Sequence, residues 1–220
     1  MARHFLVLDD HPVIHTILVQ LLAELEPGAR ISLTHRLEQA LATLRQQPGP
    51  DLALVDLHLA DGHGPDVIAQ LRRARPDCPV AVFSASTDSP TILRCLEAGA
   101  VGYIPKTHTG EAIMGALRLI TSGCPYLPAQ VLASREEARG VARTRLSGHT
   151  DPSHLGLTTR QIEVLRLILR GLPNKLICRQ LRLAEGTVKV HVSAVLRALG
   201  VNNRTQAVIA ASRLGLEVPD

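Results

Sequence analysis

The chain has 220 residues, of which 45% are hydrophobic, 2% aromatic and 20% charged. This hydrophobic share supports a packed core and excludes a disordered chain, and the scarcity of aromatic residues requires an aliphatic core. Residues 1–125 carry 10 basic and 13 acidic side chains, whereas residues 126–220 carry 14 and 7, so the front part has a net charge of −3 and the back part of +7. The asymmetry predicts two domains, the second with a polyanionic partner.

The four cysteines are scattered along the chain and form no CxxC pair. This spacing argues against a zinc ribbon or a redox motif and is typical of a reducing compartment. No apolar run approaches the ~18 residues of a membrane span. The apolar start, Phe5 to Leu8, leads directly into two acids, unlike a signal peptide. We therefore expect a soluble, cytoplasmic protein without a membrane partner.

Short apolar runs alternate with helical apolar spacing through the front part of the chain. The predicted strands are His4–Leu8, Ile31–Leu33, Leu52–Val55, Val80–Phe83 and Val101–Ile104. The predicted helices are Pro12–Glu26, Leu37–Gln46, Pro65–Arg75, Pro90–Ala98 and Glu111–Thr121. This order predicts a doubly wound α/β domain with a parallel, five-stranded sheet.

Polar side chains close four of these apolar runs: Asp9 and Asp10, Asp56, Ser84 and Lys106. One acid after a strand is ordinary loop chemistry, but function collects at the carboxyl ends of strands in such sheets. Clustered carboxylates repel one another and need a hard cation such as Mg²⁺. A carboxylate can also attack phosphorus, while a cation and an ammonium group neutralise the transferring phosphoryl group.

The front part resembles the receiver domain of response regulators, a flavodoxin-like fold, over residues 1–124. The stretches that carry the resemblance are Leu8-Asp9-Asp10-His11-Pro12, Leu54-Val55-Asp56-Leu57, Phe83-Ser84-Ala85-Ser86 and Gly102-Tyr103-Ile104-Pro105-Lys106. The resemblance implies that Asp56 is the phosphoacceptor. It also implies that Mg²⁺ is held by Asp10, by Asp9 largely through water, by Asp56 and by the backbone carbonyl of His58.

The same resemblance implies that Ser84 is a hydroxyl switch, Lys106 contacts the phosphate and Tyr103 is an aromatic switch. Tyr103 also fits a strand aromatic that simply packs on the core. The histidines of the front part, His11 and His58 included, are interpreted as surface residues rather than as side-chain ligands. The sequence departs from the receiver pattern at Leu59-Ala60, where Met-Pro is usual.

The residues from 125 to 154 are predicted to form a linker, because glycine and proline recur and apolar periodicity is weak. A short polar helix at Val131–Ala138 fits within it. The domain that follows, residues 155–220, is predicted to be a small bundle of four helices. Its first helix begins at a capping box, Thr158-Thr159-Arg160-Gln161, and ends at Gly171. The other three helices begin at Pro173, at Glu185 and near Asn202.

The helix predicted at Glu185–Leu199 has an apolar stripe, and its opposite face carries Gly186, Lys189, Val190, Ser193 and Arg197. Two helices joined by a tight turn, the second with a basic face, indicate a helix-turn-helix, although a plain bundle with a solvated basic face has the same pattern. The domain resembles the LuxR-type module through Leu157–Leu165, Gly171–Lys175, Gly186–Val192 and Val201–Thr205. The combination resembles the NarL/FixJ subfamily of response regulators.

The resemblance to the LuxR-type module implies that Lys189, Val190 and Ser193 face the major groove of DNA. It also implies that contacts to DNA phosphates come from Asn174, Lys175, Thr187 and Arg204. Two departures from the family pattern are Ala198, at a usually basic position, and Ala184, where a serine or threonine usually caps the recognition helix.

We therefore predict a transcriptional response regulator rather than a turnover enzyme. Its partners are a sensor histidine kinase, promoter DNA and a second copy of the chain when phosphorylated, with RNA polymerase as a further candidate. An aspartate-nucleophile phosphohydrolase is disfavoured because His58 stands where its second acid belongs. A ligand-sensing LuxR-type regulator is disfavoured because this chain has no tryptophan to line a ligand pocket. A regulator with a vestigial receiver is the third alternative.

Overall fold

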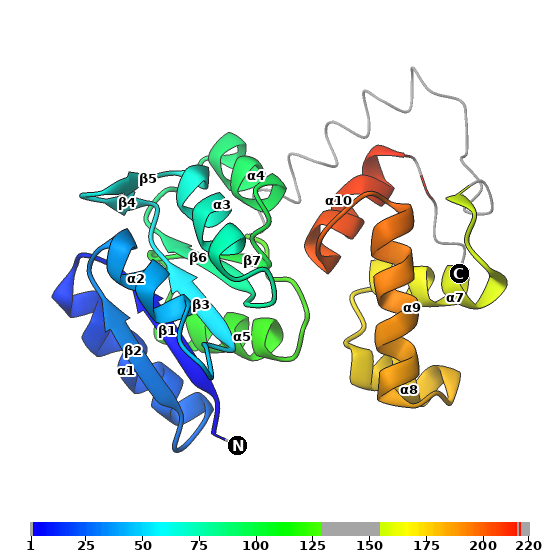
Figure 1. Cartoon of the computed structure of the whole chain (residues 1–220), viewed down its shortest axis with the longest axis horizontal. Helices are drawn as coiled ribbons and strands as arrows, with labels where there is room; N and C mark the ends of the chain where they lie inside the picture. Colours follow the sequence, from blue (N-terminus) through cyan, green and yellow to red (C-terminus); the bar gives the residue numbers. More distant parts are fainter. Residues whose placement is uncertain (1, 129–154, 215, 217–220) are drawn as a thin grey trace. The chain divides into compact units, whose positions relative to one another are not determined.

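The structure, a computed structural model, describes residues 2–128, 155–214 and 216. These residues form two compact units, one built on residues 2–121 with Tyr126 and the other on the helices that follow residue 154. The two units are coloured from blue to green and from yellow to red in Figure 1. The predicted helix at Val131–Ala138 lies outside the described residues.

A parallel sheet in the order β2-β1-β3-β6-β7 forms the centre of the first unit. Its strands are β1 (His4–Leu8), β2 (Arg30–Thr34), β3 (Leu52–Val55), β6 (Val80–Ser84) and β7 (Gly102–Pro105). Its helices are α1 (Pro12–Leu25), α2 (Leu37–Leu44), α3 (Pro65–Ala74), α4 (Ser89–Glu97) and α5 (Gly110–Thr121). The predicted doubly wound fold is therefore confirmed.

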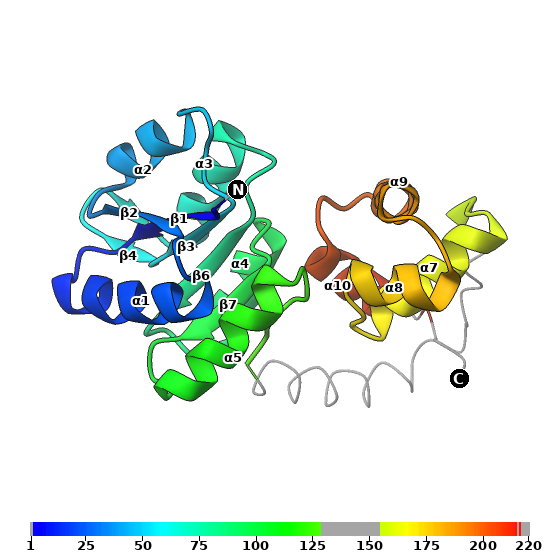
Figure 2. The ribbon, with the colours of Figure 1, turned by 90° about the horizontal axis from the view of Figure 1, so that it is seen from below.

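Helices cover both faces of the sheet, with α1 next to α5 on one face and α3 between α2 and α4 on the other (Figure 2). Every residue of β1, β3, β6 and β7 is buried. This explains why these strands are short continuous apolar runs in the sequence. Strand β2 lies at an edge and is mostly accessible, so its sequence pattern is weaker and the prediction missed both of its ends.

The edge of the sheet at β7 is covered by the residues that follow α5. The Tyr103 N–H donates to the carbonyl oxygen of Tyr126 at 2.9 Å. The Tyr126 side chain packs against the core, and its hydroxyl lies 2.9 Å from Nε2 of His108. The predicted linker begins at residue 125, and within it Tyr126 packs with the first unit.

Four helices form the described part of the second unit: α7 (Thr159–Leu169), α8 (Asn174–Leu181), α9 (Glu185–Ala198) and α10 (Arg204–Arg213). The capping box is present, because Thr158 accepts from the Gln161 N–H and Gln161 accepts from the Thr158 N–H. Helix α9 packs against both α7 and α8. The core of the unit is aliphatic and includes Val164, Leu165, Ile168, Ile177, Val188 and Val195.

Candidate functional site

An acidic cluster lies where β1 and β3 end. The two strands are adjacent and in register, with Leu8 opposite Val55, so the residues that follow them, Asp9 and Asp56, are neighbours. The Asp56 N–H donates to the carbonyl of Leu8 at 2.8 Å, which fixes the start of the loop. Asp9 is 1% exposed and Asp56 is 3% exposed, whereas Asp10 is accessible.

Lys106 links the two buried carboxylates. Its Nζ lies 2.7 Å from Oδ2 of Asp9 and 2.8 Å from Oδ2 of Asp56, and only 12% of its side chain is exposed. The lysine follows β7, two strands away from β3, so sheet topology brings together residues that are 50 positions apart. Buried carboxylates this close need compensating charge, and one ammonium group neutralises only one of them. The cluster can therefore accept further positive charge.

His11 also belongs to the cluster. Its ring Nδ1 lies 2.7 Å from Oδ1 of Asp10 and 3.2 Å from Oδ1 of Asp9. Its backbone N–H donates to the same Asp9 oxygen at 3.0 Å. One ligand atom from each of Asp9, Asp10, His11 and Asp56 lies within 4.8 Å of the others. The His11 ring is exposed, as we expected of the front-part histidines, but that expectation is wrong for His4 and His15, which are buried. Sequence reasoning also missed that His11 contacts both acids.

Ser84 and Tyr103 lie beside the same end of the sheet. Ser84 is the last residue of β6 and is fully buried, and its hydroxyl makes no hydrogen bond of good geometry with the described residues. The Lys106 N–H donates to the Ser84 carbonyl at 2.8 Å. Tyr103 is turned inward, where its hydroxyl donates to the carbonyl of Ser86 at 2.7 Å. Burial raises the pKa of Tyr103 well above its ordinary value.

The loop that follows Asp56 contains a small antiparallel ribbon that the sequence analysis did not predict. Strands β4 (His58–Leu59) and β5 (Gly62–His63) form it, and the buried Leu59 side chain anchors it. Both carboxylate oxygens of Asp61 accept backbone N–H groups at the start of α2, from Leu37 and Glu38. These contacts hold the loop in place where receivers usually have Met-Pro.

The second candidate surface is the helix-turn-helix formed by α8, a turn and α9. Arg182 ends α8 in the left-handed conformation, with φ of 53°, which makes the turn sharp. Ala184 precedes α9 and provides no side-chain cap, as the sequence indicated. The outer face of α9 exposes the residues predicted to face DNA, and Val190 is 68% exposed. A hollow of about 350 Å³ on this face is lined by Lys189, Val190, Ser193, Ala194 and Arg197.

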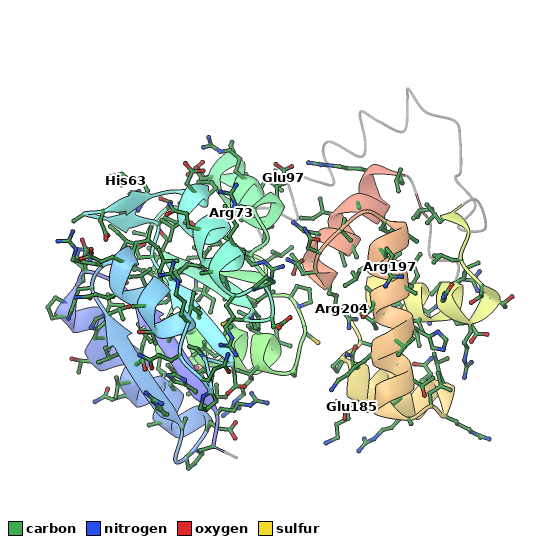
Figure 3. All side chains as sticks on the ribbon, in the orientation of Figure 1. His63, Arg73, Glu97, Glu185, Arg197 and Arg204 are labelled. Carbon is green, nitrogen blue, oxygen red and sulfur yellow. The ribbon has the colours of Figure 1, made fainter. Side chains whose placement is uncertain are left out.

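Charged groups on α9 are arranged along this exposed face (Figure 3). Nζ of Lys189 lies 3.0 Å from Oε1 of Glu185, one turn nearer the start of the helix. Arg197 lies two turns further along, and we had placed it on this face without assigning it a contact. Thr187 and Lys175 are exposed, and Asn174 is half-buried at the start of α8.

Arg204 does not lie with these residues. Its guanidinium turns inward at the start of α10, where Nη2 donates to the carbonyl oxygens of Leu167 and Ile168, at 3.4 Å and 3.2 Å. These carbonyls belong to the last turn of α7, and they also accept from the backbone N–H groups of Leu172 and Gly171, both at 3.0 Å. Burial lowers the pKa of Arg204. The arrangement gives Arg204 a structural role that conflicts with the phosphate contact expected from the sequence.

The fold and these sites define a receiver-type domain followed by a helix-turn-helix domain. Residues 5–118 match the family model of the response regulator receiver domain, and residues 155–211 match that of bacterial regulatory proteins of the luxR family. The glycerol metabolism activator of Pseudomonas putida is 34% identical over 94% of this chain and 93% of its own. The nitrate/nitrite response regulator NarL of Escherichia coli K12 is 30% identical over 93% and 92%.

A LuxR family DNA-binding response regulator from Silicibacter pomeroyi is 32% identical, covering 57% of this chain and 97% of its own, with a TM-score of 0.51. The response regulator RcsB of Salmonella typhimurium, 19% identical, shares the fold over 97% of this chain with a TM-score of 0.55. The chain belongs to the response regulators, in the NarL/FixJ group that joins a receiver to a LuxR-type DNA-binding domain. None of the described helices is long and apolar enough to cross a membrane.

Proposed function

We propose that Asp56 is the residue that accepts, in the cytoplasm, a phosphoryl group from a sensor histidine kinase. The observation that carries the proposal is the buried Asp56 carboxylate, held by the Leu57 N–H on one oxygen and by Lys106 on the other. During transfer an Asp56 oxygen forms a bond to phosphorus while the phosphorus–nitrogen bond of the donor breaks. Lys106 lies where it neutralises charge on the transferring group.

The acidic cluster fits Mg²⁺, because the carboxylates of Asp9, Asp10 and Asp56 converge and oxygen ligands suit this ion. The backbone carbonyl of His58 is a further proposed ligand. When bound, the ion offsets negative charge on the carboxylates and the incoming phosphoryl oxygens. Oδ1 of Asp9 accepts from the His11 N–H and Oδ2 lies 2.7 Å from Nζ of Lys106, which supports the predicted contact of Asp9 with the ion through water.

The test is intact-protein mass spectrometry of the full chain with acetyl phosphate. We expect one added phosphoryl group that requires Mg²⁺ and is absent in Asp56→Asn. The matched control is Asp66→Asn, an acid at the start of α3, which should be labelled like the parent chain. Equal labelling of Asp56→Asn would refute the assignment. Each chain should take up a single group, as expected of a regulator rather than a turnover enzyme.

We propose that phosphorylation shifts the receiver between two states. Ser84 is suited to contact the new phosphate because its buried hydroxyl lacks a good partner, and Tyr103 is the proposed aromatic switch. In the phosphorylated state two chains form a dimer that binds promoter DNA and contacts RNA polymerase. Such a switch works by changing the populations of two states that differ in their affinity for the partner.

The proposed DNA surface is the exposed face of α9, where Lys189, Val190 and Ser193 read bases. Lys175, Thr187 and Asn174 are the proposed phosphate contacts, and the half-buried, inward-turned guanidinium of Arg204 makes Arg204 less suited to the same role. The supporting observation is that three side chains named from the sequence line one hollow together with Arg197. A binding titration of the phosphorylated full chain on duplex DNA tests this, and Val190→Asp should abolish sequence-specific binding. Unchanged binding by Val190→Asp would remove α9 from the interface.

A further inference from the structure

We propose that His11 is a nitrogen ligand of the cation site, so that the site prefers divalent cations of the first transition row to Mg²⁺. The proposal rests on the proposed function of the acidic cluster as a cation site. His11 directly follows the acid pair in the sequence, and its ring approaches both acids.

The distances match the coordination shell of a small cation. Six ligand atoms at about 2.1 Å from one octahedral ion lie about 3 Å apart at adjacent corners and about 4.2 Å apart at opposite corners. Nδ1 of His11 lies 2.7 Å from an Asp10 oxygen and 3.2 Å from an Asp9 oxygen. With a carboxylate oxygen of Asp56 included, the four ligand atoms lie within 4.8 Å of one another. Nδ1 of His11 and the Asp10 oxygen are therefore spaced like adjacent ligands of one shell, while Asp9 is proposed to reach the ion through water.

The direction of the ring nitrogen supports the same conclusion. Carboxylates only accept hydrogen bonds, so Nδ1 of His11 must be a donor to Asp9 and Asp10 in the ion-free protein. A ring nitrogen points its proton along the direction of its lone pair. A cation that replaces this proton, with the remaining ring proton on Nε2, therefore lies between the ring and the two carboxylates. The ring is free to shift, because 64% of the His11 side chain is exposed.

The choice of cation follows from the mixed donor set. Mg²⁺ prefers oxygen ligands and keeps its waters, whereas imidazole suits transition-metal ions, with an affinity that rises from Mn²⁺ to Cu²⁺ and falls again at Zn²⁺. Adding one imidazole to three carboxylates therefore raises the affinity for such ions with little effect on Mg²⁺. Lys106 does not compete for this position, because it contacts the other oxygen of Asp9.

Mn²⁺ is the probe for the test, because pulsed electron paramagnetic resonance detects a directly bound ¹⁴N nucleus. In the full chain we expect one bound Mn²⁺ with imidazole ¹⁴N coupling. His11→Gln should lose the coupling and bind Mn²⁺ about tenfold more weakly, while its Mg²⁺ affinity changes less than twofold. His63→Gln, which removes an exposed imidazole from β5, is the matched control and should behave like the parent chain.

The outcomes separate this inference from the proposed function. If Mn²⁺ binds the parent chain without ¹⁴N coupling, or if His11→Gln weakens Mn²⁺ and Mg²⁺ alike, His11 only positions the acids and the inference is overturned. If Asp10→Asn leaves Mn²⁺ binding unchanged, the acidic cluster is not the cation site, and the proposed function fails at that step as well.

Discussion

Replacing Lys106 with methionine should strongly destabilise the receiver unit when divalent cations are absent. The substitution keeps the aliphatic stem but removes the ammonium group that lies within 2.8 Å of Asp9 and Asp56. Both carboxylates are almost fully buried. Breaking a buried ion pair costs about 3–5 kcal/mol, because the charge that remains is uncompensated. We expect about 3 kcal/mol here, since the lysine is 12% exposed and water can partly replace it.

The two tyrosines of the chain, Tyr103 and Tyr126, both lie in the receiver unit, and the chain has no tryptophan. Tyrosine fluorescence of the intact protein therefore follows the unfolding of this unit alone. With a urea slope of about 1.5 kcal/mol per M, a loss of about 3 kcal/mol lowers the midpoint by about 2 M. The measurement is made at pH 7.5 with a chelator.

A second substitution separates lost charge from lost packing. Adding Asp56→Asn to Lys106→Met removes one of the uncompensated carboxylates and should recover at least half of the lost stability. An equal midpoint for the parent chain and Lys106→Met would refute the reasoning, because the carboxylates would then need no compensation. A large loss that Asp56→Asn does not rescue would show that packing, rather than charge, causes it.

Three further predictions concern the basic surface, Arg204 and the buried histidines. Lys189→Ala should lower the affinity for target DNA more than the affinity for scrambled DNA. Lys175→Ala should lower both affinities alike and reduce the slope of log affinity against log salt concentration by about 1. Equal losses on both duplexes for Lys189→Ala would make Lys189 a phosphate contact. Arg204→Met should destabilise the second unit by about 2 kcal/mol in calorimetry, because two helix-end carbonyls lose a charged donor, and should leave the salt slope unchanged. Burial lowers the pKa of His15, and the nearby His35 lowers it further, so the unfolded chain binds more protons and receiver stability should fall as the pH drops below about 6.5. The fall in urea midpoint between pH 7.5 and 5.5 should shrink in His15→Gln, and an unchanged fall would exclude His15 as its cause.

The fold was largely predictable because two signals in the sequence agree. Four of the five strands are buried on both faces, and such strands must be apolar throughout, so they are conspicuous as short runs. The residue after each run lies at one edge of the sheet, which made Asp9, Asp56 and Lys106 candidates for a common site. The structure brings these three together.

The ribbon after Asp56 was missed for a physical reason. Each of its strands has two residues, too few to show any periodicity. The ribbon is held by the carboxylate of Asp61, which accepts the Leu37 N–H at the start of α2. Leu37 lies 24 residues away from Asp61 in the sequence. The contact of His11 with the acids is local, yet the sequence only shows that the residues are adjacent. Adjacent side chains after a strand can point in different directions, so adjacency alone does not predict contact.

Arg204 and Tyr126 show what the sequence alone does not predict about the role of a charged residue and about the position of a domain boundary. A cation in a basic domain looks like a DNA contact in sequence, because composition does not reveal the direction of its side chain. Arg204 points inward, where its guanidinium donates to the Leu167 and Ile168 carbonyls at the end of α7, which also accept from backbone N–H groups. Tyr126 follows the turn-forming residues Gly123 and Pro125, so in the sequence it resembles part of a linker. Tyr126 packs with the receiver because β7 is an edge strand, whose outer N–H groups have no neighbouring strand to pair with. The Tyr103 N–H donates instead to the carbonyl oxygen of Tyr126. In both cases the deciding partner is a backbone group that comes within reach only once the fold has formed.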